Sequence, residues 1–280
     1  MRYKTILVHL NDERRAGQVI DAAAHLADRH EANLIGIYVV PSDIVGSPTA
    51  LGRRIIGTGR QAFRDEAARI AKIFQTATAG RAIVPEWRVI DPARHHPGCA
   101  EAVIELSRST DLIVAAQADP NWDYTLLLDF PERLAIESGR PTLIIPHAGR
   151  FPSFGKRVVL AWNGKKEAAR AAFDALPLLK QAAAVRVLYV GTGGPSEVTD
   201  IARGSEIAAA LARHGVKCET AQSVSGDIDV GNDLLSRLAD FGADLLVMGC
   251  YGHSRFREFV FGGATREILE HMTVPVLMSH

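Results

Sequence analysis

The sequence contains few cysteines and no long hydrophobic run, and each absence excludes a class of protein. Only Cys99, Cys218 and Cys250 occur among 280 residues, far apart and without a Cys-x-x-Cys pair. This usage argues against a disulfide framework and is typical of reduced proteins. No apolar stretch approaches the roughly 20 residues of a membrane helix, and no signal-peptide pattern follows Met1. We therefore expect a cytoplasmic protein that does not enter a membrane.

The sequence also lacks an excess of either charge. Lys and Arg total 32, Asp and Glu total 32, and the formal net charge is zero. Proteins that bind nucleic acids or membrane surfaces usually present a basic face, so we predict neither partner. The hydrophobic fraction of 47% is that of a globular chain, and 280 residues suffice for two domains.

What the sequence does contain is an internal repeat. Residues 4–11 and 156–163 are both apolar segments that end in Asn, and each precedes an Ala-rich helical pattern, near residues 16–30 and 166–181. Further matches pair residues 33–40 with 185–190, 111–115 with 244–248, and 140–146 with 274–278. A linker with Gly and Pro, residues 148–155, separates the predicted domains 1–148 and 155–280.

Each half alternates strands with helices. The strands are continuous apolar runs, as in a parallel sheet covered on both faces. The alternation predicts two tandem doubly wound parallel five-stranded sheets, an α/β fold of Rossmann-like type. Ligands of such folds bind at the carboxyl edge of the sheet. In the second half, Asn163 after the first strand and the loop after the fourth strand would share that edge.

That loop is the strongest functional signal in the chain. It reads Gly249-x-x-Gly252, then nine residues, then Gly262-Gly263-x-Thr265, between an apolar strand and a helical pattern. Glycine lets the backbone approach an anion, and the N-terminus of a helix favours negative charge. The arrangement predicts a phosphate-binding loop. The competing explanation is a tight strand-to-helix turn, in which glycine is common for its geometry alone.

These residues resemble the universal stress protein family in its tandem form. Its signature, Gly, two residues, Gly, nine residues, Gly and a small hydroxyl residue, puts Gly249, Gly252 and Gly262 in register. The resemblance covers nearly the whole chain, once per half, and implies the strand order 3-2-1-4-5. It also implies that the loop holds the phosphates of ATP or a related adenine nucleotide, with or without Mg. Asn163 at the end of the first strand and Val190 at the end of the second belong to the same implied site.

The second half departs from the family pattern at two positions. Gly263 stands where Ser or Thr is usual, so one hydroxyl is lost, whereas Thr265 matches a second hydroxyl position. Asn163 stands where Asp is usual. Its amide can still hydrogen-bond a base or a ribose, so we expect binding to be weakened or retuned.

The first half departs much further. The counterparts of Gly249, Gly252, Gly262, Gly263 and Thr265 are Ala116, Asp119, Asp129, Phe130 and Glu132. Carboxylates and a bulky ring replace the phosphate cradle, and like charges a few ångströms apart repel by about 1 kcal/mol even in water. We therefore predict a degenerate first domain that binds no nucleotide.

Other candidate residues have simpler structural explanations. His95-His96 and Cys99 are of metal-ligand type, but Cys99 shares a helical face with apolar residues and is predicted to be core, so we predict no metal site. His9 is a conceivable general base, yet a lone histidine at a strand end is more often structural. Ser254 beside His253 is expected to cap a helix. No catalytic residue is assigned.

Three segments leave alternatives open. The apolar segment 124–130 either packs over the vacated site of the first half or lines a site for an apolar ligand or partner. Residues 256–261 pose the same question in the second half, where we expect a packed lid. Arg255 and Arg257 either contact phosphates or remain solvated.

The sequence thus predicts a regulatory binding protein rather than an efficient enzyme. It has no Gly-x4-Gly-Lys-Ser/Thr loop and no evident acidic Mg²⁺ cluster beside the glycine loop, so ATP hydrolysis should be slow at most. The alternatives are a weak ATPase or nucleotidyl transferase, and a nucleotide-free interaction or stress-protection protein with a vestigial loop. Short apolar strands at 141–146 and 275–279 predict an intrachain pseudo-dimer of the halves, and a homo-oligomer is a further option.

Overall fold

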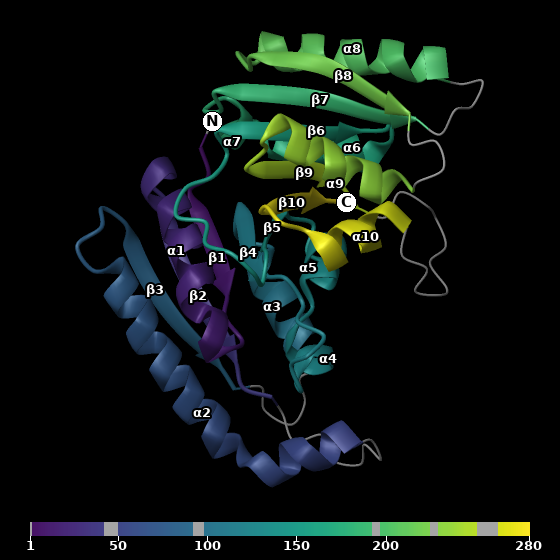
Figure 1. The fold of residues 1–280 in the computed structure, drawn as a ribbon. Helices are drawn as coiled ribbons and strands as arrows, with labels where there is room; N and C mark the ends of the chain where they lie inside the picture. The colour runs from purple at the N-terminus through teal and green to yellow at the C-terminus, as the bar shows by residue number, and fades with distance from the viewer. Residues whose placement is uncertain (1, 42–49, 92–97, 192–196, 225–228, 251–262) are drawn as a thin grey trace. The chain divides into compact units, whose positions relative to one another are not determined.

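The computed structural model describes residues 2–41, 50–91, 98–191, 197–224, 229–250 and 263–280. The chain divides into two compact units, residues 2–152 and 153–280 (Figure 1). Each unit is a five-stranded parallel sheet flanked by helices. In the part of the chain that the structure describes, no helix combines the length and apolarity needed to cross a membrane.

The first unit confirms the predicted fold class and strand order. Its elements are β1 (Thr5–His9), α1 (Glu13–His30), β2 (Asn33–Val39), α2 (Ala50–Thr78), β3 (Val84–Ile90), α3 (Cys99–Ser107), β4 (Leu112–Ala116), α4 (Thr125–Leu128), α5 (Pro131–Glu137) and β5 (Thr142–Ile145). The strands lie in the order β3-β2-β1-β4-β5, all pairs parallel. This is the predicted 3-2-1-4-5 order.

The second unit has the same order. It contains β6 (Arg157–Trp162), α6 (Lys166–Asp174), α7 (Leu176–Leu179), β7 (Ala184–Gly191), α8 (Glu197–Arg213), β8 (Cys218–Val224), α9 (Val230–Phe241), β9 (Leu245–Gly249), α10 (Gly263–His271) and β10 (Val276–Ser279). The strands run β8-β7-β6-β9-β10, again all parallel. The helix expected over residues 166–181 is interrupted between α6 and α7, because Pro177 provides no N–H for a continuous ladder.

An aspartate just before the fourth strand of each unit fixes the start of the central first strand. The Asp111 carboxylate accepts hydrogen bonds from the backbone N–H groups of Lys4 (2.6 Å) and Thr5 (3.0 Å). The Asp244 carboxylate accepts from those of Gly155 (3.0 Å), Lys156 (3.0 Å) and Arg157 (2.9 Å). Asp111 and Asp244, which match each other in the repeat, therefore both bind the backbone at the start of the first strand of their unit.

The helices bury small side chains against the sheets. In α1, the inward face is dominated by Ala16, Ala23, Ala27, Ile20 and Leu26. Alanines let the helix axis approach the sheet closely at no cost in side-chain entropy. The helix ends at Glu31, whose left-handed backbone (φ 53°) caps the last turn. This packing fixes the position of α1 on the sheet, and with it the position of the helix start that follows the carboxyl end of β1.

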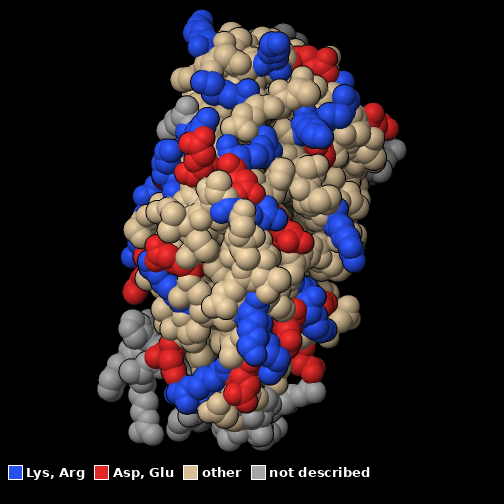
Figure 2. All heavy atoms as spheres, turned by 90° about the vertical axis from the view of Figure 1, so that its left-hand side faces the viewer, with Lys and Arg blue, Asp and Glu red and all other residues tan. Residues whose placement is uncertain are grey.

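The surface carries both charges in mixture. On the face shown in Figure 2, Lys and Arg side chains alternate with Asp and Glu among the residues described. Many are paired on one helix, such as Arg170 with Asp174 (2.7 Å) and Arg266 with Glu270 (2.7 Å). Exposed pairs of this kind contribute little to stability, at most about 1 kcal/mol each.

Candidate functional site

The switch point of the second sheet lies between β6 and β9. β6 pairs with β9 on one side and with β7 on the other, so the chain reverses its direction across the sheet here. Asn163 directly follows β6, and Gly249 is the last residue of β9. These two predicted residues therefore lie at neighbouring strand ends, where doubly wound folds bind ligands.

The N-terminus of α6 packs directly against the end of β9. A Cβ atom built on Gly249 would lie 2.4 Å from the backbone nitrogen of Ala168 and 2.4 Å from the carbonyl carbon of Glu167. Only glycine permits this approach, so Gly249 has a packing role that the sequence did not indicate. Its predicted contact with a nucleotide stays a prediction.

The first turn of α6 is not capped by a side chain. Its N-cap residue is Lys165, which provides no acceptor to the free N–H groups, whereas the corresponding Asp12 of α1 accepts from the Arg14 N–H at 2.9 Å. The exposed Asn163 accepts from the backbone N–H of Lys165 (3.1 Å). Free N–H groups and the helix dipole make such a terminus favourable for an anion.

The remaining predicted site residues are partly described. Val190 is half-buried near the end of β7, the neighbour of β6. Gly263 is the exposed first residue of α10, and Thr265 is buried in the first turn of that helix. Gly252 and Gly262 lie outside the described residues, as do His95-His96 and the predicted lid and arginines of residues 251–262. The structure thus gives both ends of the glycine loop but not the loop itself.

Two of the three cysteines are core residues, whereas Cys218 is half-buried. Cys99 and Cys250 are buried, and burial raises the pKa of each thiol to about 12, which makes both unreactive. Within the described ranges, the one cluster of possible metal ligands is Glu267, Glu270 and His271 on the surface of α10. His271 and Glu267 are one helical turn apart and 3.1 Å from each other, a common surface pairing.

The corresponding edge of the first unit is filled by its own charged side chains. Asp129, with 1% of its side chain exposed, accepts from the Arg15 guanidinium at 2.9 and 3.1 Å. It also accepts from the Asp119 N–H (3.1 Å), the Thr125 hydroxyl (3.0 Å) and the Asn11 amide. We call these five residues the Asp129 cluster. A carboxylate of the protein thus occupies the donors at this edge of the first unit, and the absence of nucleotide binding there stays a prediction.

Aromatic rings close the Asp129 cluster. Trp122 lies over the guanidinium of Arg15, 5.3 Å from ring centroid to Cζ. Phe130 packs on His9 with ring centroids 4.7 Å apart. Of segment 124–130, Leu128 and Phe130 are buried, so this part packs inward as the first of the two alternatives proposed. The sequence did not reveal the role of Arg15, because its distant partner comes from another element.

His9 is structural rather than catalytic. Burial, reinforced by the positive charge of Arg15, lowers the pKa of His9 to about 3. A base of such low pKa is poorly matched to proton transfer near neutral pH. His30 is also buried, with both ring nitrogens unpaired and its ring 4.9 Å from that of Tyr3. Burial, with the charge of Arg29, lowers the pKa of His30 to about 4.

These two histidines predict a loss of stability in acid. Between pH 6.5 and about 4 the unfolded chain protonates both rings and the folded chain neither, so folding weakens as the pH falls. Each ring contributes about 1.4 kcal/mol per pH unit. The variant His30→Phe keeps the ring and removes both nitrogens. In urea unfolding at pH 7 and pH 5, it should lose about 2 kcal/mol less than the wild type. Equal losses would contradict the burial of a neutral His30.

Comparisons with known proteins agree with this architecture. Residues 155–280 match the model of the universal stress protein family. A universal stress protein from Archaeoglobus fulgidus DSM 4304 is 16% identical with a TM-score of 0.69, over 98% of this chain and 95% of that one. A putative universal stress protein from Pseudomonas aeruginosa UCBPP-PA14 is 15% identical with a TM-score of 0.59, over 99% and 93%. No curated protein matches the chain.

Two tandem α/β units, each with the order 3-2-1-4-5 and a switch point beside its first strand, define the class of this protein. The second half belongs to the universal stress protein family, which confirms the resemblance seen in the sequence. The likeness over the full length extends the fold of that family to the first half.

Proposed function

We propose that the second unit binds ATP or a related adenine nucleotide at the β6–β9 switch point, as a cytoplasmic stress-response regulator without efficient catalysis. The observation that carries the proposal is the close approach of α6 to Gly249. It holds a helix N-terminus without a side-chain cap against the strand that leads into the glycine loop. The N-terminus of α6 and the start of the glycine loop thus lie at the same edge of the sheet, and both are features that favour anion binding.

The side chains around this edge suit a nucleotide. Asn163 is exposed, and while its Oδ1 accepts from the Lys165 N–H, its side-chain NH2 group can donate to a base or a ribose hydroxyl. Lys165 and Lys166 at the start of α6 supply positive charge, and the buried Glu167 is matched by Lys166 at 3.5 Å. Gly263 is the exposed first residue of α10, and a phosphate oxygen can accept from the backbone N–H groups of such a helix start.

The first unit supports a single site per chain. Its Asp129 cluster occupies the equivalent edge, and α1 is capped by Asp12 where α6 has Lys165. A phosphate entering this edge would have to displace a buried ion pair and face the carboxylates of Asp12 and Asp129. We therefore propose that the first unit binds no nucleotide.

The proposed role is binding, with any hydrolysis slow. Positioned donors alone hold a nucleotide, whereas rapid phosphoryl transfer needs in addition a group that orients the nucleophile and neutralises developing charge. Nucleotide-stimulated signalling through a partner is the activity that such a site supports. A nucleotide-free interaction protein is the second candidate, and the experiment below separates the two.

The variant Gly263→Asp tests the site without disturbing the fold. A Cβ at Gly263 meets no atom within 4 Å, and an acidic residue in the first turn of a helix is favourable to folding. The new carboxylate would repel a phosphate at the same place. Calorimetry with ATP should give about micromolar to millimolar affinity for the wild type. For Gly263→Asp we expect at least about a tenfold loss, or roughly 1.4 kcal/mol.

The matched control is Gly263→Ala, which adds the same Cβ without the charge. It should bind ATP within about a factor of three of the wild type, while both variants melt at the wild-type temperature or above. Equal heats for wild type and Gly263→Asp would overturn the nucleotide site. An absence of heat in all three proteins, with adenine nucleotides tested in turn, would favour the nucleotide-free alternative.

A further inference from the structure

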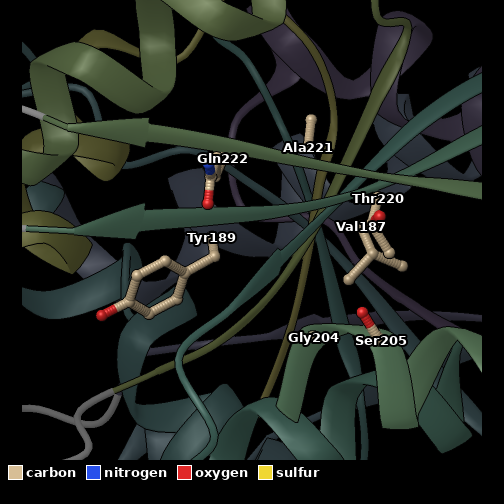
Figure 3. Close-up of a pocket in the computed structure, with 7 residues that line it drawn as sticks. All are labelled: Val187, Tyr189, Gly204, Ser205, Thr220, Ala221 and Gln222. Atoms are coloured by element: carbon tan, nitrogen blue, oxygen red, sulfur yellow. The ribbon is translucent and has the colours of Figure 1, made fainter. Parts of the chain in front are cut away.

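The second unit contains a hollow between its sheet and α8 that the proposed nucleotide site does not use. It measures about 320 Å³ and is lined by Val187 and Tyr189 of β7, Thr220, Ala221 and Gln222 of β8, and Gly204 and Ser205 of α8. Figure 3 shows Val187 and Thr220 pointing toward Ser205, with Tyr189 at the far end of the hollow. A volume of this size is at the lower end of small-molecule sites.

Gly204 keeps the hollow open. It is buried inside α8, yet a Cβ at this position would meet no atom within 4 Å. Glycine inside a helix costs about 1 kcal/mol relative to alanine. Neither a close contact nor a left-handed backbone explains it, because no tight neighbour exists and Gly204 is not among the glycines with positive φ. The residue lowers helix stability and leaves a space above β7 and β8.

The first unit fills the equivalent space with its own rings. Strand register makes Gly36 of β2 the counterpart of Val187, and Trp87 of β3 the counterpart of Thr220. Ring atoms of Phe74 in α2 and of Trp87 come within 2.8 Å of a Cβ built on Gly36. These two rings lie 5.5 Å apart between centroids. The second unit has Val187 in place of Gly36 and Thr220 in place of Trp87, and α8 contains no aromatic residue, so smaller side chains occupy this space than in the first unit.

The lining suits an uncharged ring with polar substituents. Among its residues, the hydroxyls of Ser205 and Thr220 and the amide of Gln222 offer donors and acceptors, and none carries a charge. Tyr189 offers an aromatic face, against which planar rings pack favourably. Next to Tyr189 in register lies Trp162 of β6, whose indole nitrogen is buried and has no hydrogen-bond partner.

We infer that this hollow is a second ligand site, which takes an uncharged aromatic heterocycle of one or two fused rings. The ligand ring packs against Val187 and Tyr189. Its polar atoms are bound by Ser205, Thr220 and Gln222. Because the hollow lies under α8 and the nucleotide is assigned to the β6–β9 switch point, the two sites are separate. Each inference can fail without the other.

The experiment uses 5-fluoroindole as the probe and the full-length chain. Fluorine NMR line broadening should show saturable binding with a Kd of about 1 mM or tighter, as small fragments give. The variant Gly204→Leu places a side chain in the hollow and should weaken binding at least about tenfold while raising the melting temperature. The control Gly17→Leu changes a helical glycine of α1 that also has no atom within 4 Å of its Cβ, and should bind as the wild type does.

A second variant, Thr220→Trp, places a large ring in the hollow and should also weaken binding at least about tenfold. It provides the test if Gly204→Leu fails to fold. The titrations are repeated with saturating ATP, which should leave the probe affinity unchanged. No saturable binding to the wild type, equal binding by wild type and a folded hollow-filling variant, or displacement of the probe by ATP would overturn the inference.

Discussion

Replacing Asp129 by alanine should lower the free energy of unfolding of the first unit by about 3–5 kcal/mol. The carboxylate is almost completely buried and accepts hydrogen bonds from four partners of the Asp129 cluster. Its removal leaves the guanidinium of Arg15, itself only 10% exposed, without its principal distant counter-charge. Arg15 keeps Asp12 at 3.1 Å, so the guanidinium loses one of its two carboxylate partners and part of the compensation for its burial.

The measurement is urea unfolding of the full chain, followed by a probe in each unit. Trp122 reports the first unit, since it lies over Arg15. The double variant Arg15→Met with Asp129→Leu removes both charges together. Because replacing a whole buried pair by apolar side chains is often close to neutral, this variant should recover most of the loss. A loss below about 1 kcal/mol for Asp129→Ala would mean that the Asp129 cluster is hydrated in solution.

The result bears on function because the Asp129 cluster lies where the second unit has its proposed nucleotide site. If this edge of the first unit is held together by several kcal/mol of paired charge, a weakly bound phosphate cannot displace it. Under the proposed function, the same fold uses the carboxyl edge of one unit for a nucleotide and that of the other for internal ion pairs. The two halves thus share the same strand order but differ in the side chains at one edge.

Much of the fold follows from the repeat in the sequence. The apolar segments that begin at residues 4 and 156 form the central strands. The aspartates that precede the fourth strands occupy matching places in the repeat, and each binds backbone N–H groups at the start of the first strand of its own unit. Local signals were sufficient to predict the strands and helices, because a hydrophobic run or a helical periodicity is contained within a single element of the sequence. Pro177, which divides α6 from α7, was a local signal that the predicted continuous helix overlooked.

The site was less accessible to sequence reasoning because its contacts join distant elements. The glycine spacing indicated Gly249, but not that α6 packs on it, since that depends on the path of a helix much earlier in the chain. Arg15 looked like one charge in a helix, although its partner Asp129 is 114 residues away. The hollow beside Gly204 likewise depends on rings that are missing from two other elements. The spacing of residues within a motif does not indicate which residues from distant parts of the chain will pack against it.

The replacement of Gly249 by alanine should have an equally large effect, a destabilisation of about 3 kcal/mol in the second unit. The added Cβ would lie 2.4 Å from two backbone atoms of α6, at Glu167 and Ala168. Flexible side-chain ends can move aside, but here the whole first turn of a helix must shift, together with its contacts to β9 and β10. Well-packed interiors accommodate such shifts poorly.

Thermal and urea unfolding of Gly249→Ala measure this loss, with Gly263→Ala as the control. A Cβ on Gly263 meets open space, so the control should remain within about 0.5 kcal/mol of the wild type. ATP titration at a temperature where both variants are folded then separates packing from ligand contact. A Gly249→Ala protein as stable as the wild type but unable to bind ATP would make Gly249 a nucleotide contact alone. A destabilised protein that still binds ATP would make its role purely structural, because the shifted helix would then contribute nothing to the phosphate site.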